Sequence, residues 1–402
     1  MNTFITILWI ILFVALTGAV YFYVGRRLIR PFDLAKRRKI IAWSAITLLY
    51  LVHVSMVLLV GRRIESPLID RFAWIAFITL GLFSSVLALL LIRDLPLGMM
   101  RLAQKLRAFI KRKTYRGTPV ESTLNPDRRN FLLRSTNYGI LGAAVVMSGY
   151  GLYESRRRPI LKNVDLSIPK LPKAFNGFRI VQFSDLHVGP TIKKTFVEAV
   201  VADIQSLQPD LIVFTGDLVD GSVAWLQDDV APLRALAAPH GVWFVTGNHE
   251  YYSGVKPWMQ EVTRIGMNVL HNEHQIIEHR GSRIVLAGVT DWSGGGFSKD
   301  HASSPAQAIH NAPEDAIKIL LAHQPKTIFE AARVGFDVQL SGHTHGGQFF
   351  PWNYLAMLNQ PYITGLHQHG NTQIYINRGT GYWGPPLRVG IPSEITLITL
   401  SS

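Results

Sequence analysis

Three long apolar runs in the first quarter of the chain constrain its folding more than any other feature. They occupy residues 4–24, 40–60 and 72–92, and none of them contains Lys, Arg, Asp or Glu. A helix needs about 20 apolar residues to cross a bilayer, and helices buried in soluble proteins rarely extend so far without a charge. We therefore expect three transmembrane helices. A shorter charge-free run at 137–153, which contains several Gly and Ser, is a candidate fourth span.

The excess of positive charge is confined to this membrane region. The formal net charge is +14, but residues 1–153 hold 21 Lys and Arg against 6 Asp and Glu, whereas residues 154–402 hold 20 against 21. A basic nucleic-acid-binding domain is therefore poorly supported, and no nucleic acid is expected as a specific partner. The chain contains no Cys, which excludes disulfides, a thiolate nucleophile and a Cys-based zinc site.

The connections between the apolar runs indicate an orientation, because cytoplasmic loops carry an excess of Lys and Arg. Residues 25–39 hold seven, 61–71 hold three and 93–136 hold eleven. The first and third connections are therefore expected in the cytoplasm, and a fourth span would place the C-terminal part outside. The arginines at 156–158 favour the opposite side. The stretch 127–134 resembles an internal twin-arginine export signal, although its arginines are also typical flanks of a span.

The pattern changes near residue 160 to short β-branched runs, each followed by a polar cluster and often by a helical segment. Alternation of such strands with helices predicts an α/β domain. We expect a membrane region over 1–153, a short linker at 154–159 and one domain over 160–402. The expected strands are 160–166, 179–183, 211–214, 242–245, 284–287, 317–321, 338–340, 373–376 and 395–400, with helical segments near 197–204 and 233–237.

Five polar clusters follow five of the expected strands. Ligand sites in α/β sheets form beyond the carboxyl ends of strands, and Asp-x-His or His-x-His places two ligands on one side of extended backbone. A single His after a strand is more often a capping residue, but five such clusters indicate metal binding. Oxygen and imidazole ligands suit Mn, Fe or Zn, and there are too many for one tetrahedral ion. The clusters are Ser184-Asp185-Leu186-His187, Gly216-Asp217, Gly247-Asn248-His249-Glu250, Ala322-His323 and Gly342-His343-Thr344-His345.

In order, these blocks resemble the D-x-H, G-D, G-N-H-E, H and G-H-x-H motifs of the calcineurin-like metallophosphoesterase superfamily. The resemblance extends over about 160–402 and implies an α/β sandwich of two mixed β-sheets flanked by helices, here preceded by an α-helical transmembrane region. It also implies two divalent metal ions and a catalytic histidine that faces the substrate phosphate. By resemblance, Asp185, His187 and His345 would bind the first metal, Asn248, His323 and His343 the second, Asp217 would bridge both, and His249 would be catalytic, with Asp220 and Glu250 in supporting roles.

The membrane segments add a similarity to a branch of bacterial membrane-associated phosphodiesterases. The implied protein is a multi-pass phosphoric ester hydrolase of the inner (cytoplasmic) membrane, in which a hydroxide bridging the metals attacks phosphorus in line. Anchoring to the lipid bilayer favours a lipid-linked or envelope substrate. The alternative is a catalytically silent sensory or binding protein on the same fold, whose mark would be a missing ligand or a missing site histidine. No motif position is missing.

Two further sets of side chains are candidates for substrate contacts. Arg378 and Arg388 follow the last motif and suit a phosphate, because Arg binds phosphate well, although a structural salt bridge explains them equally. Four tryptophans would suit an acyl chain or the bilayer interface, although core packing explains some of them. They are Trp258, Trp292, Trp352 and Trp383.

Overall fold

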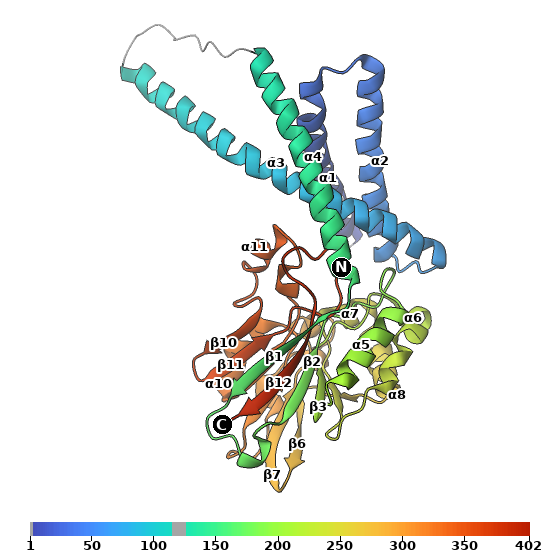
Figure 1. Cartoon of the computed structure of the whole chain (residues 1–402), viewed down its shortest axis with the longest axis vertical. Helices are drawn as coiled ribbons and strands as arrows, with labels where there is room; N and C mark the ends of the chain where they lie inside the picture. Colours follow the sequence, from blue (N-terminus) through green and yellow to red (C-terminus); the bar gives the residue numbers. More distant parts are fainter. Residues whose placement is uncertain (1–2, 115–125) are drawn as a thin grey trace. The chain divides into compact units, whose positions relative to one another are not determined.

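The computed structural model describes residues 3–114 and 126–402, and the chain divides into two compact units. The first unit consists of Met1–Arg62 and Ile75–Gly149, and the second of Arg63–Trp74 and Tyr150–Ser402. The described part of the first is helical, whereas the second contains the sheets (Figure 1). The second unit thus includes most of the connection between the second and third apolar runs and the first residues of the third run, which the sequence did not predict.

Four long helices contain the apolar runs: α1 (Thr3–Ile29), α2 (Lys36–Gly61), α3 (Pro67–Thr114) and α4 (Pro126–Arg156). Within the described ranges, three stretches are long and apolar enough to cross a membrane. The three predicted membrane helices are therefore confirmed in length and composition. The run at 137–153 lies inside α4, which is not one of the three, and its crossing of a membrane stays a prediction. The three stretches are Leu8–Phe32, Lys36–Gly61 and Pro67–Arg107.

The expected connection at 93–136 is helical at both ends. Residues 93–114 continue α3 and residues 126–136 belong to α4, whereas 115–125 lie outside the described residues. Lys, Arg and Leu are frequent in 93–114 and are good helix formers, so the helix extends beyond its apolar run. A polar network marks this point, because Asp94 pairs with Arg27 and Arg93, and Arg93 donates to Oδ1 of Asn137 at 2.6 Å. The network links α1, α3 and α4.

Two mixed sheets form the second unit. The first has the strand order β1-β12-β2-β3-β4-β5, and its strands β2 to β5 are parallel. The second has the order β10-β11-β9-β8-β7-β6, with four parallel strands between antiparallel edge strands. The strands are β1 (Ile160–Ser167), β2 (Arg179–Phe183), β3 (Leu211–Phe214), β4 (Val242–Phe244), β5 (Asn268–Val269), β6 (Glu273–His279), β7 (Ser282–Gly288), β8 (Lys318–Leu321), β9 (Val338–Ser341), β10 (Gly365–His369), β11 (Thr372–Ile376) and β12 (Glu394–Ser401).

The predicted fold class, two mixed sheets flanked by helices after an apolar helical region, is confirmed. Each of the nine predicted strands is present with its ends shifted by at most two residues, whereas β5, β6 and β10 were not predicted. The helical pattern near 197–204 belongs to α5 (Lys194–Ser206). The pattern near 233–237 differs, because the helix there is a short 3-10 turn at Ala231–Ala235 that contains Pro232.

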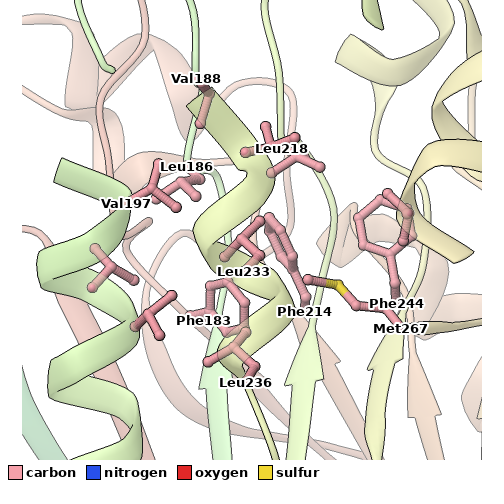
Figure 2. Close-up of a cluster of buried hydrophobic side chains, with 14 of the residues drawn as sticks. Phe183, Leu186, Val188, Val197, Phe214, Leu218, Leu233, Leu236, Phe244 and Met267 are labelled. Atoms are coloured by element: carbon pink, nitrogen blue, oxygen red, sulfur yellow. The ribbon is translucent and has the colours of Figure 1, made fainter. Parts of the chain in front are cut away.

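Alternation along the strands fills apolar cores on both faces of the first sheet. In β3, Val213 packs in the core shared with the second sheet, whereas its neighbour Phe214 packs toward the helices. Figure 2 shows this second core, where Phe183 and Phe244 from the flanking strands lie with Phe214. The flanking helices are α5, α6 (Val223–Val230) and α8 (Val255–Arg264) on the first sheet, and α9 (Pro305–Ala308) and α10 (Ile328–Val334) on the second.

Candidate metal centre

The predicted metal ligands all follow the carboxyl ends of parallel strands. Asp185 and His187 follow β2, Asp217 follows β3, and Asn248 is the first residue of α7 (Asn248–Ser253), which follows β4. The remaining three come from the other sheet, and the contacts below show that the ends of both sheets meet. They are His323 after β8 and His343 and His345 after β9.

The first predicted ligand group joins the loops after β2 and β9. One ligand atom each of Asp185, His187 and His345 lies within 4.8 Å of the others, and all three side chains are buried. The Nε2 atoms of the two histidines are 3.0 Å apart, and Nε2 of His345 is 3.4 Å from Oδ1 of Asp185. Neighbouring ligands on an ion with bonds of about 2.1 Å have separations of roughly this size. The group therefore fits a metal ion.

The second predicted group surrounds Nε2 of His323. This atom lies 3.1 Å from Oδ2 of Asp217, 3.1 Å from Nδ1 of His343 and 3.2 Å from Oδ1 of Asn248. Nδ1 of His323 donates to the backbone carbonyl of Thr215 at 2.7 Å, which directs the lone pair of Nε2 toward the group. These nitrogen and oxygen atoms again have the spacing of metal ligands.

Asp217 lies between the two groups. Its Oδ2 atom is 3.1 Å from Nε2 of His323 in the second group and 3.7 Å from Nε2 of His187 in the first. Asp217 is also buried, so its charge has little solvent to screen it. This position fits a carboxylate that contacts two cations, as the family resemblance implies.

Strained backbone accompanies the predicted ligands. The φ angle is 53° at Asp185, 51° at His187, 59° at Asp217, 73° at His343 and 51° at His345. A non-glycine residue in this left-handed region costs roughly 1–3 kcal/mol, and such residues cluster at functional sites. The concentration of this strain at the predicted ligands supports a functional shape for these loops.

Glycine allows the loops to approach one another. A Cβ atom on Gly247 would lie 2.1 Å from Oδ1 of Asp217, and one on Gly342 would lie 2.4 Å from Oδ2 of Asp185. In this close arrangement the backbone N–H of His249 donates to Oδ1 of Asp217 at 2.9 Å. The turn after β4 therefore positions the central carboxylate directly.

His249 lies at the edge of the groups, with its Nε2 atom 3.9 Å from Oδ2 of Asp217. Its Nδ1 atom is hydrogen bonded to Oδ1 of Asp220, whose Oδ2 lies 3.2 Å from Nδ1 of His187. Burial opposes charge on His249, but the carboxylates of Asp217 and Asp220 outweigh it and raise its pKa to about 9. The ring can therefore donate a proton at neutral pH. His187, Asp217 and His249 also form a third candidate metal group.

Glu250 links the loop after β3 to the turn after β4 through hydrogen bonds. Its buried carboxylate accepts hydrogen bonds from the backbone N–H groups of Asp217 at 3.0 Å, Leu218 at 2.8 Å and Gly247 at 2.6 Å. Sequence reasoning assigned Asp220 and Glu250 only general supporting roles. Glu250 accepts from the backbone N–H of Gly247 at the start of α7 as in a capping box, which is a local sequence signal for Glu250. The other partners of Glu250 and those of Asp220 come from loops that are distant along the chain.

The two candidate arginines differ in their surroundings. Arg388 is fully buried, and its guanidinium donates to the carbonyls of His345 at 3.1 Å and Arg378 at 2.8 Å, with Nη2 3.0 Å from Nδ1 of His345. Arg378 donates to Oγ1 of Thr364 at 2.9 Å and pairs with Glu394 at 3.6 Å. Both lie near the site, and a substrate contact for either stays a prediction.

The tryptophans divide between core and surface. Trp258 is fully buried in the core under α8, whereas Trp292 and Trp383 are about half exposed. The side chain of Trp352 lies outside the described residues. The ring of Trp383 is 5.7 Å from that of His249 between centroids, which places one predicted apolar contact beside the candidate site.

Comparisons with known proteins agree with this geometry. The family model of the calcineurin-like phosphoesterases matches residues 178–347, which include all five motif blocks. An uncharacterised metallophosphoesterase of Helicobacter pylori strain J99 is 38% identical over 283 residues, which cover 68% of this chain and 73% of that protein. The Bacillus subtilis metallophosphoesterase YkuE is 33% identical over 285 residues, which cover 68% of this chain and 98% of that protein.

An animal relative is named as a transmembrane protein. The transmembrane protein with metallophosphoesterase domain of Danio rerio is 36% identical over 263 residues, which cover 63% of this chain and 60% of that protein. This chain therefore spans about three fifths of the length of the zebrafish relative. From the matched motifs and these identities, the chain belongs to the calcineurin-like metallophosphoesterases, a family of metal-dependent phosphoric ester hydrolases.

Proposed function

We propose that the chain is a membrane-anchored phosphodiesterase that works with two metal ions. The observation that carries the proposal is the convergence of buried oxygen and imidazole ligands from both sheets, with 3.0–3.7 Å between neighbouring ligand atoms. Their spacing and left-handed backbone support two adjacent cation sites. The proposed metal ligands are Asp185, His187, Asp217, Asn248, His323, His343 and His345.

The donor set suits Mn, Fe or Zn. Bound there, two divalent ions would supply Lewis acidity toward the phosphate and an activated water for in-line attack on phosphorus. The chain provides a shared carboxylate in Asp217 and a neutral amide oxygen in Asn248, which leaves the pair net positive. Burial and the nearby Arg388 lower the pKa of His345 well below its ordinary value, so its ring stays neutral, as a metal ligand requires.

His249 is the proposed proton donor to the leaving oxygen. The carboxylates of Asp217 and Asp220 raise the pKa of the ring to about 9, which favours its protonated form, and its Nε2 atom lies 3.9 Å from Oδ2 of Asp217. Asp220 orients the ring through Nδ1. A proton delivered as the ester bond breaks stabilises the charge that develops on the leaving group.

The charges near the site support a diester substrate. A phosphodiester carries one negative charge, whereas a monoester carries close to two at neutral pH. The guanidinium of Arg388 is enclosed by protein carbonyls, and Arg378 pairs with Glu394. Because protein groups already bind both guanidinium groups, neither is placed to balance the second negative charge of a phosphomonoester.

We further propose that this domain lies on the outer side of a bacterial cytoplasmic membrane and acts on a lipid-linked or envelope substrate. The Lys and Arg counts of the connections support this side. The segment after the second apolar helix also packs in the unit of the phosphoesterase domain: Glu65 accepts from N of Ser222 at 2.6 Å, and Asp70 pairs with Lys193 at 2.9 Å. If α4 crosses the membrane, the connection after α2 and the phosphoesterase domain lie on the same side of it.

The test is a hydrolysis screen with the full chain in detergent, stripped of metal and reloaded with Mn, Fe or Zn. We expect bis(4-nitrophenyl) phosphate to be hydrolysed faster than 4-nitrophenyl phosphate. Asp217→Asn should lose bound metal and at least about 100-fold in rate. Asp165→Asn, at an exposed position in β1, is the matched control and should retain both. A preference for the monoester, or no hydrolysis with any metal, would contradict the proposal.

A further inference from the structure

Two exposed aromatic side chains contact the ring of His249, and a third packs against one of them. Its ring lies 5.2 Å from that of Tyr252 and 5.7 Å from that of Trp383, and the ring of Phe297 is 5.9 Å from that of Tyr252. The exposed fractions are 51% for Tyr252, 55% for Phe297 and 55% for Trp383. Large apolar side chains that stay exposed together beside a catalytic centre are characteristic of a binding surface.

Contacts with the protein hold this surface in place. The backbone N–H of Trp383 donates to Oε1 of Gln348 at 2.9 Å, and Nε2 of Gln348 donates back to the carbonyl of Trp383 at 2.9 Å. Gln348 closes the G-H-x-H loop, so the position of Trp383 is tied to the metal ligands. Phe297 packs on Tyr251 with ring centroids 5.3 Å apart. The carbonyl of Tyr252 accepts from Nη2 of Arg63 at 2.7 Å.

We propose that Tyr252, Phe297 and Trp383 form a subsite for the apolar chain of a phosphoester lipid. This inference rests on the proposed function and names the part of the substrate that the metal groups do not bind. A phosphate at the metals would lie beside His249, so an attached alkyl chain can cover these rings. Burial of apolar surface stabilises such a complex by about 25 cal/mol per Å².

The surroundings favour a lipid chain over a nucleobase. Arg63 follows Gly61, the last residue of the apolar helix α2, by two residues, which reach at most about 7 Å. Arg63, which donates to the carbonyl of Tyr252, is therefore only two residues along the chain from the end of a candidate membrane span. The segment after the last metal motif exposes further apolar side chains. These are Tyr354, Met357 and Leu358.

The experiment compares the methyl and octyl esters of 4-nitrophenyl phosphate, with the 4-nitrophenyl ester of thymidine 5′-phosphate as the nucleobase arm. The full chain is used in nanodiscs, and the measured quantity is the ratio of kcat/KM values between esters. We expect the wild type to prefer the octyl over the methyl ester at least tenfold, mainly through KM. Trp383→Ala and Phe297→Ala should each reduce this ratio at least threefold. Phe329→Ala removes an equally exposed ring from α10 and should retain the wild-type ratio.

Bound metal, measured by mass spectrometry, must equal that of the wild type in each variant, which excludes a damaged site. Equal kcat/KM for the octyl and methyl esters in the wild type would overturn the subsite but leave the proposed function standing. A preference for the thymidine ester that Trp383→Ala removes would overturn the lipid chain as occupant. An unchanged octyl preference in both variants would overturn the assignment of these residues. No hydrolysis of any ester would overturn the proposed function itself, and the subsite with it.

Discussion

The contacts of His249 favour a role as proton donor over a role as metal ligand. It lies within reach of His187 and Asp217, yet its Nδ1 atom is held by Asp220 and its pKa is raised to about 9. We expect His249→Ala to retain both metals and to lose about 10²–10⁴-fold in turnover. Mass spectrometry of bound metal and hydrolysis of an aryl phosphodiester check this. His310→Ala, at an exposed histidine, is the control. Full activity, or loss of one metal, would show that the proposed role is wrong.

Metal binding at His323 should depend on pH. Burial disfavours the charged ring, but the carboxylate of Asp217 outweighs it and raises the pKa to about 10. A metal ion must displace this proton, because only an unprotonated nitrogen coordinates. Below pH 10, the affinity should therefore fall as the pH falls, by up to about tenfold per pH unit.

Calorimetry in buffers with different ionisation enthalpies measures the released protons directly. At pH 7.5 we expect at least one proton per pair of metal ions in the wild type, and fewer in His323→Ala. Binding without proton release would contradict the arrangement of His323 and Asp217.

The turn between β4 and α7 and the loop after β3 act as one element. A Cβ atom added to Gly247 would lie 2.1 Å from Oδ1 and 2.6 Å from the backbone N of Asp217, and Glu250 accepts hydrogen bonds from the backbone of both segments. Such a Cβ atom would force the carboxylate of Asp217 to move. We expect Gly247→Ala to weaken metal binding at least tenfold while the chain still folds. Gly296→Ala, where an added Cβ meets no atom within 4 Å, should bind metal like the wild type. Equal affinities would show that the contact does not position Asp217.

The strands and motif loops could be predicted from sequence because each carries a local pattern. The β-branched runs of β2 and β3 are bounded by polar clusters, and their predicted ends match the structure. Strand β6 escaped prediction because Glu273–His279 is rich in charged and polar residues. It lies at a sheet edge, where one buried apolar side chain, Ile277, suffices. Strand β10 is an edge strand of the same kind. Short edge strands depend on a neighbour, which a local pattern does not reveal.

Contacts between residues that are distant along the chain could not be predicted from the sequence either. The motifs identified the candidate metal ligands one by one, but no spacing indicated that Asp220 contacts two histidines or that Arg388 is buried behind His345. The same holds for the segment Arg63–Trp74. The sequence assigns it to the connection after the second apolar run and to the start of the third run, whereas the structure places it in the unit of the phosphoesterase domain. Such contacts depend on partners that are distant along the chain.

The membership of Arg63–Trp74 in the second unit predicts the topology of the whole molecule. The chain has no native cysteine, so single cysteines can be labelled without background. We expect an impermeant maleimide to label Ile64→Cys, at an exposed position of this segment, and Ser402→Cys in intact cells, and to label Lys36→Cys only after permeabilisation. The reason is that the connection after α2 and the C-terminal domain share one unit, whereas the first connection carries seven Lys and Arg. Opposite labelling of Ile64→Cys and Ser402→Cys would contradict the crossing of α4. Protection of both in intact cells, with Lys36→Cys labelled, would instead overturn only the outward orientation.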